Sequence, residues 1–306
     1  RNLDWLRQRH REGLRVELGD VRDPHALANV VADASAVLHL AAQVAVTSSV
    51  EDPLHDFEVN AAGTLRLLEA LRRRPSPPPL IFASTNKVYG RLLDDAELVR
   101  GPTRWQPGDA RRHAGCDERT QLDFHSPYGC SKGVADQYVL DYARVFGLRT
   151  VVFRMSCLYG PHQRGNEDQG WVAHFLIQAL RGRSITIFGD GLQVRDVLYV
   201  DDAVEAWLLA LQEVKALSGR AFNLGGGPGN TLSLREMLTL IERSTGRRPA
   251  VRYEDWRPGD QRWYVSDTRA FEGATGWRPR TAPEAGLAHL RKWLEAQLPA
   301  WTEVAA

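Results

Sequence analysis

Cysteine is scarce in this sequence, and no apolar run is long enough to cross a membrane. The three cysteines, Cys116, Cys130 and Cys157, are an odd number at no metal-ligand spacing. They predict neither a disulfide framework nor a metal site, and they are typical of a reducing compartment. No apolar stretch approaches the ~20 residues that a membrane-spanning helix needs. The charged, amphipathic opening "RNLDWLRQRH" is unlike a signal peptide, so we expect no membrane association.

An excess of one charge sign is also absent. The 39 basic and 38 acidic residues leave a formal net charge of +1. This balance removes the electrostatic argument for nucleic acid or acidic lipid as a partner. Lysine is rare among the cations, since only Lys87, Lys132, Lys215 and Lys292 occur. The first two of these lysines lie inside motifs that are described below.

Strand-like and helix-like segments alternate regularly over the first two thirds of the chain. The expected strands are residues 14–20, 36–42, 80–90 and 149–160, and the expected helices are residues 24–33, 56–74 and 128–147. Alternation with short links predicts βαβ units and hence a parallel sheet flanked by helices. Strands this uniformly apolar fit a sheet that is covered on both faces. The predicted fold class is therefore α/β, with a doubly wound parallel sheet.

The character of the sequence changes near Pro161, where short segments rich in Gly, Trp and Arg begin. We expect a main domain of residues 1–160, to which residues 192–215 return. A smaller α+β domain is expected from residues 161–191 and 216–306. Residues 91–123 are polar and irregular, and they are too many for a simple connection, so a functional loop is expected there.

A tyrosine and a lysine lie one helical turn apart in "SPYGCSKG". Tyr128 and Lys132 share a helix face, so both side chains can point into one cleft. A neighbouring cation favours the phenolate, although moving a phenol from a pKa near ~10 to neutrality takes roughly 4 kcal/mol, more than one lysine supplies. Thr85 offers a hydroxyl where an apolar strand ends. Taken alone, such a pair would more often be solvated surface residues, because short motifs often occur by chance.

Several motifs together resemble the extended short-chain dehydrogenase/reductases that modify nucleotide-bound sugars, the NAD-dependent epimerase/dehydratase family. In chain order they are "HLAAQ", "VNAAGT", "STNKVYG", "SPYGCSKG", "QVRDVLYVDD" and "RPGDQR". The longer segments "ASTNKVYG", "LDFHSPYGCSKG", "NEDQGWVAHF" and "GDGLQVRDVLYVDD" resemble the CDP-paratose 2-epimerase (CDP-tyvelose epimerase) branch. The resemblance runs from about Gly19 to Trp293. It implies a Rossmann-like NAD-binding domain and a second domain that binds a nucleotide diphosphate sugar.

The resemblance also implies a reaction and a set of site residues. The sugar would be oxidised at C2 with NAD to a transient ketone and reduced from the other face. The implied catalytic residues are Thr85, Tyr128 and Lys132. The implied cofactor-binding residues are Asp20, Leu40, Ala41, Ala42, Asn60, Tyr128 and Lys132. The implied substrate-binding residues are Asn86, Asn166, Arg195, Arg257 and Asp260.

One difference from the dehydratases of this family reduces the number of reactions that this chain could catalyse. Dehydratases carry an Asp-Glu pair after the hydroxyl residue, whereas this chain has Asn86 and Lys87 there. An amide and an ammonium cannot act as a carboxylic acid and a carboxylate, so elimination is disfavoured. His125 could be a further acid or base, or a residue packed beside the site.

Alternatives to a C2 epimerase remain open at this stage. Family members begin with a strand, a glycine-rich turn, a helix and a second strand, which this sequence lacks, so we expect an N-terminally truncated chain. A UDP-sugar 4-epimerase is the nearest enzymatic alternative. The second alternative is a non-catalytic scaffold that has lost its cofactor. By resemblance we expect a cytoplasmic homo-oligomer, either a dimer or a tetramer.

Overall fold

The larger part of the molecule is built around a four-stranded parallel sheet. The computed structural model describes residues 2–302. The sheet has the order β1-β2-β5-β9, and all of its neighbouring strands run parallel. Its strands are β1 (Val37–His39), β2 (Leu80–Thr85), β5 (Thr150–Met155) and β9 (Arg220–Leu224). Every residue of β2 is buried, which is the condition expected for a strand covered on both faces. The prediction of an α/β fold with a parallel sheet is confirmed.

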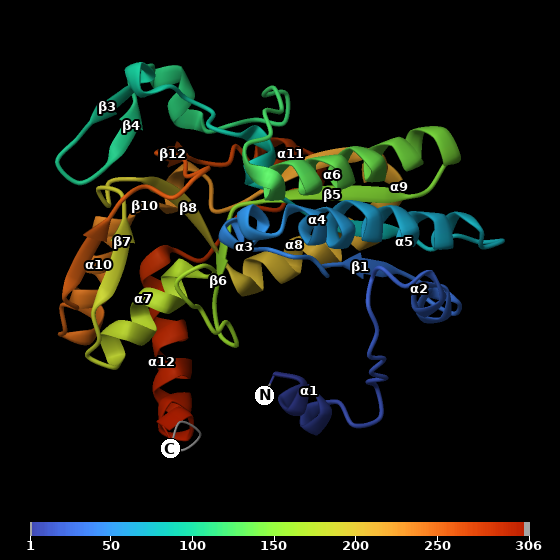
Figure 1. Ribbon diagram of the computed structural model, residues 1–306, viewed down its shortest axis with the longest axis horizontal. Helices are drawn as coiled ribbons and strands as arrows, with labels where there is room; N and C mark the ends of the chain where they lie inside the picture. The colour runs from blue at the N-terminus through green and yellow to red at the C-terminus, as the bar shows by residue number, and fades with distance from the viewer. Residues whose placement is uncertain (1, 303–306) are drawn as a thin grey trace.

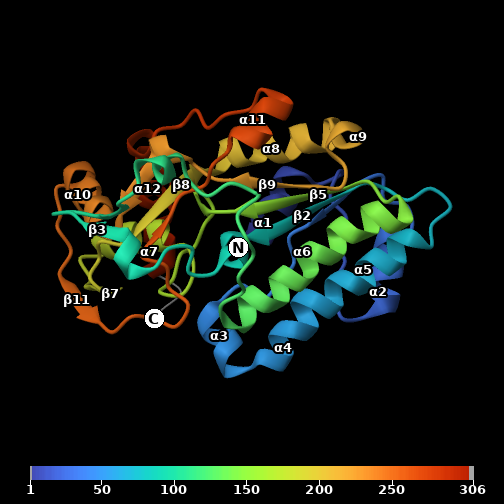
Figure 2. The same cartoon turned by 90° about the horizontal axis from the view of Figure 1, so that it is seen from above.

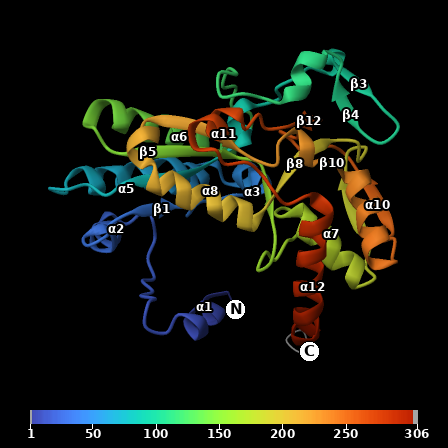
Figure 3. The ribbon, with the colours of Figure 1, turned by 180° about the vertical axis from the view of Figure 1, so that it is seen from behind.

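Two layers of helices cover this sheet (Figures 2 and 3). Because side chains alternate along a strand, Leu80 and Phe82 pack with one layer, and Ile81 packs with the other. The first layer contains α2 (Pro24–Val31), α5 (Gly63–Arg72) and α6 (Ser126–Phe146). The second layer contains α8 (Val200–Gln212), α9 (Val214–Leu217) and α11 (Arg269–Thr275). The two layers bury β2 and most of β5, whereas Leu38 on the edge strand β1 is exposed.

The helix α6 carries the tyrosine–lysine motif. Pro127 lies in its first turn, where a missing N–H costs nothing, and Gly147 ends it in the left-handed conformation at φ 69°. Its N-terminal end contacts α3 (Val46–Glu51) and α4 (Pro53–Phe57). A short π-helix, η1 (Glu58–Ala62), follows α4 and leads into α5.

Smaller sheets and helices make up the second part. The strand β8 (Val194–Tyr199) pairs with β6 (Cys157–Tyr159), β10 (Thr231–Ser233) and β12 (Trp263–Tyr264). The strand β7 (Ile185–Phe188) pairs in parallel with β11 (Val251–Glu254). Around them lie α7 (Trp171–Leu180), α10 (Leu234–Thr245) and α12 (Pro283–Thr302). All of these helices and strands except β12 contribute to one apolar core; Trp263 and Tyr264 of β12 belong to neighbouring clusters.

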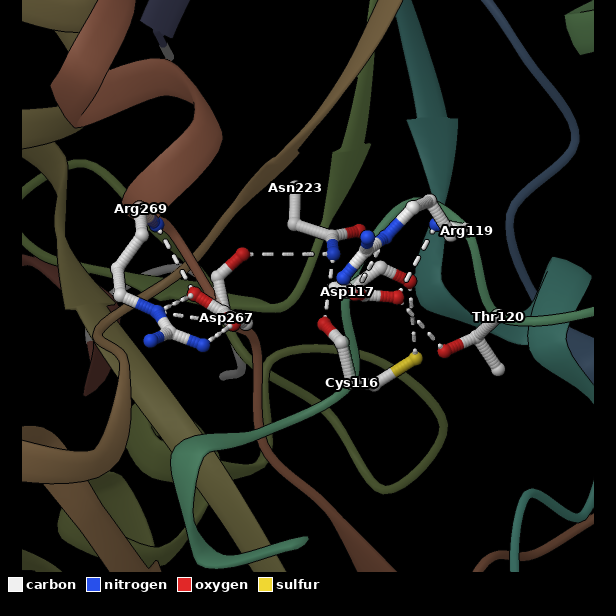
Figure 4. A network of polar contacts seen from close by, with 7 residues as sticks. All are labelled: Cys116, Asp117, Arg119, Thr120, Asn223, Asp267 and Arg269. Carbon is white, nitrogen blue, oxygen red and sulfur yellow. Dashed lines mark hydrogen bonds and ion pairs between the residues drawn. The ribbon is translucent and has the colours of Figure 1, made fainter. Parts of the chain in front are cut away.

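The long stretch 91–123 contains a hairpin and ends in an anchored segment. The hairpin pairs β3 (Leu98–Arg100) with β4 (Trp105–Pro107). Figure 4 shows the anchor: Asn223, from β9, donates from its side chain to the carbonyl of Cys116 at 2.7 Å. The amide of Asp267 also donates to the Cys116 carbonyl, at 2.9 Å. Short 3₁₀ helices also occur at η2 (Asn86–Tyr89), η3 (Asp95–Glu97), η4 (Ala110–Ala114) and η5 (Pro228–Asn230).

Three sequence-based expectations differ from the structure. The strands β6 and β8 pair with each other outside the main sheet, although residues 1–160 and 192–215 were expected in the main domain. Residues 14–20 form no strand, because no described segment pairs with them and Leu18 is exposed; they follow the short helix α1 (Asn2–Arg9). The strand β9 belongs to the main sheet, although residues 216–306 were expected in the smaller domain. Its pairing partner β5 is about 70 residues away in sequence, so local pattern could not indicate it. No helix among residues 2–302 combines the length and apolarity of a membrane span.

Candidate active site

The catalytic residues implied by the sequence meet at the carboxyl end of β2. Thr85 is the last residue of that strand, and both Tyr128 and Lys132 are buried on the first turns of α6 beside it. The Thr85 hydroxyl lies near the Tyr128 phenol and acts to lower its pKa. It also accepts the amide of Lys87 at 3.2 Å, which fixes its position. The structure therefore places the hydroxyl and the phenol at the end of β2, with Lys132 one helical turn further along α6 and its amine on the carbonyl of Ala83.

The amine of Lys132 points toward the sheet. Its Nζ donates to the carbonyl of Ala83 at 2.6 Å and lies 4.2 Å from the centre of the Phe82 ring. Burial lowers the pKa of Lys132 to about 7, while the carboxylates of Asp136 and Asp56 act in the opposite direction. One hydrogen bond uses one of the three N–H groups of an ammonium, so two donors remain for a ligand.

Tyr128 does not have the lowered pKa that the sequence suggested. Burial raises the pKa of Tyr128 to about 12, although the hydrogen bond from Thr85 acts to lower it. Lys132 does not counter this effect, because its amine is engaged with Ala83 rather than with the phenol. A phenolate here consequently requires additional positive charge in the site.

Small residues around Tyr128 allow α6 to approach its neighbours closely. A Cβ on Gly129 would lie 3.2 Å from the carbonyl oxygen of Lys87. A Cβ on Gly133 would lie 2.3 Å from the ring of Phe124, a distance that no side chain tolerates. Ser49 accepts the backbone amide of Tyr128 at 3.1 Å. The glycines in "SPYGCSKG" thus set the distance between the phenol and the end of β2.

Asn60 is the centre of a second polar cluster, on the π-helix η1. Its amide nitrogen donates to Ser131 on α6 and to Asp56, both at 3.1 Å. It also holds the backbone of Gln43, accepting from the amide at 2.9 Å and donating to the carbonyl at 3.0 Å. Sequence reasoning missed Gln43, Asp56 and Ser131, although the i, i+4 spacing of Asp56 and Asn60 was a usable signal. π-helices often mark functional positions.

The remaining residues that were expected to bind the cofactor are Leu40, Ala41, Ala42 and Asp20. Leu40, Ala41 and Ala42 directly follow β1, and Leu40 is exposed. Asp20 is held by the guanidinium of Arg22 at 2.7 Å, which lowers the pKa of Asp20 to about 2. These two residues line a hollow of about 430 Å³ together with Asp23, Glu58 and Arg66.

The residues present fit NAD. Lys132 has two free donors next to Tyr128, which suits the hydroxyls of the nicotinamide ribose. The buried Oδ2 of Asp56 has no hydrogen-bond partner, so a polar ligand group could complete this cluster. When bound, NAD would supply the hydride acceptor and donor. Among the described residues no cluster of three His, Cys, Asp or Glu could hold a metal.

Arg195 brings a buried cation toward this site from β8. Only 8% of the residue is exposed, and its guanidinium donates to the carbonyl of Val194 at 2.8 Å. Within residues 2–302 it forms no ion pair with a carboxylate. A buried guanidinium that lacks a carboxylate partner is suited to bind an anion such as a phosphate.

The other expected substrate residues have different surroundings. Arg257 pairs with Asp168 at 3.4 Å and lies 3.7 Å from the centre of the Phe188 ring. Asn166 uses its side-chain oxygen to accept the amides of Asp168 and Gln169, at 3.0 and 2.8 Å, so it stabilises a turn. Its contact with substrate therefore stays a prediction.

Two loops meet beside Thr85. Asn86 donates to the side chain of Gln261 at 3.4 Å, and Lys87 lies 3.7 Å from the carboxylate of Asp260. His125 directly precedes α6, is exposed and pairs with Asp123 at 2.8 Å, so neither the packed nor the catalytic interpretation is decided.

Fold and site together define an α/β protein whose parallel sheet presents a buried Thr–Tyr–Lys cluster to a second, arginine-bearing part. Proteins of this class carry out redox chemistry on a bound substrate with a nicotinamide cofactor. The sequence profile of the NAD dependent epimerase/dehydratase family matches residues 3–225. The chain belongs to this family, and the predictions of the family and of NAD as its cofactor are confirmed.

Known proteins from several organisms are similar to this chain. A CDP-paratose 2-epimerase of Salmonella typhi is 43% identical over 282 residues, which make up 90% of this chain and 82% of that protein. A putative UDP-glucose 4-epimerase of Methanocaldococcus jannaschii is 30% identical, over 86% of this chain and 78% of that protein. These relatives are epimerases, in agreement with the predicted class of enzyme.

Solved structures with NAD share the fold. The UDP-glucose 4-epimerase of Thermus thermophilus in complex with NAD has a TM-score of 0.78 and 32% identity, over 93% of this chain and 86% of that one. A dTDP-glucose 4,6-dehydratase double mutant from Streptomyces venezuelae, with NAD bound, has a TM-score of 0.82 and 27% identity. The match covers 99% of this chain and 85% of the dehydratase chain.

Proposed function

We propose that this protein epimerises a nucleotide diphosphate sugar at C2, with CDP-paratose and CDP-tyvelose as the interconverted pair. The convergence of Thr85, Tyr128 and Lys132 at the end of β2 supports the type of reaction. The 43% identity to a CDP-paratose 2-epimerase supports the choice of sugar. A buried Arg195 without a carboxylate partner among the described residues supports a diphosphate as the anchoring group.

Each residue of the cluster has a separate task. Tyr128, as the phenolate, takes the proton of the C2 hydroxyl while C2 loses a hydride, which bound NAD would accept; this leaves a ketone on the sugar. Thr85 holds the reacting oxygen by a hydrogen bond, and the buried Lys132 binds the cofactor ribose. After the ketone presents its other face, the C2–H bond forms there and Tyr128 returns the proton. The configuration is thereby inverted, and the cofactor ends unchanged.

Dehydration is not the proposed reaction, although dTDP-glucose 4,6-dehydratases are among the similar proteins. A dehydratase must protonate a leaving hydroxyl and remove a carbon-bound proton. Asn86 and Lys87 occupy the positions after Thr85, and their side chains are bound to Gln261 and to Gly259. Neither side chain is a carboxylic acid.

The proposal is tested by turnover of purified protein with NAD. CDP-paratose, UDP-glucose and UDP-galactose are supplied separately, and inversion at C2 or C4 is followed by proton NMR. We expect inversion at C2 of the CDP-sugar only. Turnover of a UDP-hexose at C4 alone would establish the alternative, a UDP-sugar 4-epimerase. No turnover, with no NAD released on denaturation, would indicate a non-catalytic scaffold.

Replacing Arg195 with alanine is expected to weaken substrate binding. Loss of a hydrogen bond to a charged group costs about 1.5–3 kcal/mol, so KM should rise roughly 10- to 100-fold with kcat little changed. Arg257→Ala should act in the same direction. Arg248→Ala is the control, because Arg248 makes an exposed pair with Glu242. Steady-state kinetics measures the effect, and an unchanged KM in Arg195→Ala would remove this arginine from the substrate site.

A cytoplasmic location and a homo-oligomer also remain part of the proposal. The thiols of Cys116, Cys130 and Cys157 are all free, which is compatible with a reducing compartment. Size-exclusion chromatography with light scattering distinguishes a monomer from the expected dimer or tetramer.

A further inference from the structure

Lys87 connects the catalytic strand end to a loop of the second part of the molecule. It follows Thr85 by two residues, at the start of η2. Its Nζ donates to the carbonyl of Gly259 at 2.9 Å and lies 3.7 Å from Oδ1 of Asp260. Both partners belong to the loop 255–262, which joins β11 to β12. One side chain thus reaches from the main sheet to a loop about 170 residues further along the chain.

The neighbouring contacts make this connection continuous. Gln261, on the same loop, is fully buried. Its side chain donates to the carbonyl of Gly90 and accepts from Asn86 at 3.4 Å. The turn 86–90 and the loop 255–262 are therefore joined at both ends of η2. Lys87 provides the only charged contact in this set of bonds among the described residues.

The surroundings of Lys87 make its charge sensitive to pH. Only 16% of its side chain is exposed. Burial lowers the pKa of Lys87 to about 8, the carboxylate of Asp260 and the thiol of Cys157 act to raise it, and the guanidinium of Arg195 acts to lower it. Lys87 thus has one carboxylate partner, Asp260, and one nearby cation, Arg195.

Building on the proposed function, we propose that Lys87 is a positioning residue that holds the loop 255–262 against the catalytic strand end, so that Arg257 and Asp260 are aligned on the nucleoside diphosphate while the sugar lies at Tyr128. The contacts of its amine with Gly259 and Asp260 place it on the loop rather than on the reacting atoms. Lys87 consequently governs substrate affinity and does not take part in proton transfer.

The first test needs no substrate. Hydrogen exchange of the amides of residues 255–262 is measured in the wild-type protein, in Lys87→Met and in Lys87→Arg. We expect exchange to be at least tenfold faster in Lys87→Met and intermediate in Lys87→Arg, which keeps a cation. Lys215→Met is the matched control, since Lys215 is exposed on α9. Unchanged exchange of the loop in Lys87→Met overturns the proposal, whichever sugar the enzyme uses.

The second test separates positioning from catalysis. In Lys87→Met, KM for CDP-paratose should rise about tenfold or more, while kcat stays within about threefold of the wild type. A fall in kcat with unchanged KM would instead make Lys87 a catalytic group and overturn the proposal. If the wild type turns over no CDP-sugar, the proposed function fails separately, and the exchange measurement still decides the role of Lys87.

The pH dependence of KM gives a third test, because a merely structural role of Lys87 would not make KM follow the charge of this residue. Below pH 8 the ammonium of Lys87 is present, and as the pH rises through about 8 it loses the charge that faces Asp260. KM of the wild type should therefore increase above about pH 8. Lys87→Arg should not show this increase, because a guanidinium stays charged. The same increase in both proteins would assign it to another group and count against Lys87.

Discussion

Replacing Tyr128 with phenylalanine is expected to lower kcat by a factor of about 10²–10⁴, the range that a general acid–base contributes. The change removes one oxygen from a buried ring, so the packing of α6 on β2 should be retained. NAD and nucleotide-sugar binding should remain close to the wild type, because Lys132, Asn60 and Arg195 are untouched. Turnover is followed by NMR, and binding is followed by calorimetry.

Tyr138→Phe is the matched control for this variant. Tyr138 lies on the same helix, ten residues further on, with its side chain partly exposed. Its phenol has no hydrogen bond among those of the described residues, so its loss should leave kcat unchanged. An undiminished kcat in Tyr128→Phe would remove the phenol from the mechanism. An equal loss in both variants would point to damage of α6 rather than to lost proton transfer.

The placement of Tyr128 at the end of a strand could be predicted from the sequence, but the direction of its pKa shift could not. The spacing of Tyr128 and Lys132 fixes a shared helix face, and a helix that starts after a buried strand places this face at the strand end. The direction of the pKa shift of Tyr128 depends on burial by distant segments. It also depends on the bond of Lys132 to the Ala83 carbonyl, 49 residues away. Local sequence contains neither contact.

The same limit explains the errors in the fold. Residues 14–20 have an alternating pattern that is typical of a strand, yet a strand needs a pairing partner, which pattern alone does not supply. The strand β9 was expected outside the main sheet because its neighbours in sequence are rich in glycine. Lys87 was recognised only as a departure from the dehydratases, since its contacts with Gly259 and Asp260 join distant loops.

Breaking the ion pair of Asp136 and Arg154 is expected to have the largest effect on stability. The pair is buried under the catalytic helix, with Nε and Nη2 of Arg154 each 3.0 Å from a carboxylate oxygen of Asp136. Ser84 donates to the same carboxylate at 2.7 Å, and Tyr89 accepts from the guanidinium at 3.1 Å. Asp136→Ala leaves a guanidinium buried without its carboxylate. The free energy of unfolding should fall by about 3–5 kcal/mol, measured by denaturant unfolding.

Two comparisons determine whether the buried charge is the cause. Asp141→Ala, on the same helix, removes an exposed pair with Arg144 whose atoms are 3.4 Å apart, and it should cost less than about 1 kcal/mol. In the double variant Asp136→Ala, Arg154→Met, the unpaired guanidinium is gone, so the loss should be smaller than the sum of the two single losses. Strict additivity, or an Asp136→Ala protein as stable as Asp141→Ala, would contradict this account. Asp136 also favours the charged form of Lys132, so its removal should weaken the proposed cofactor binding as well as stability.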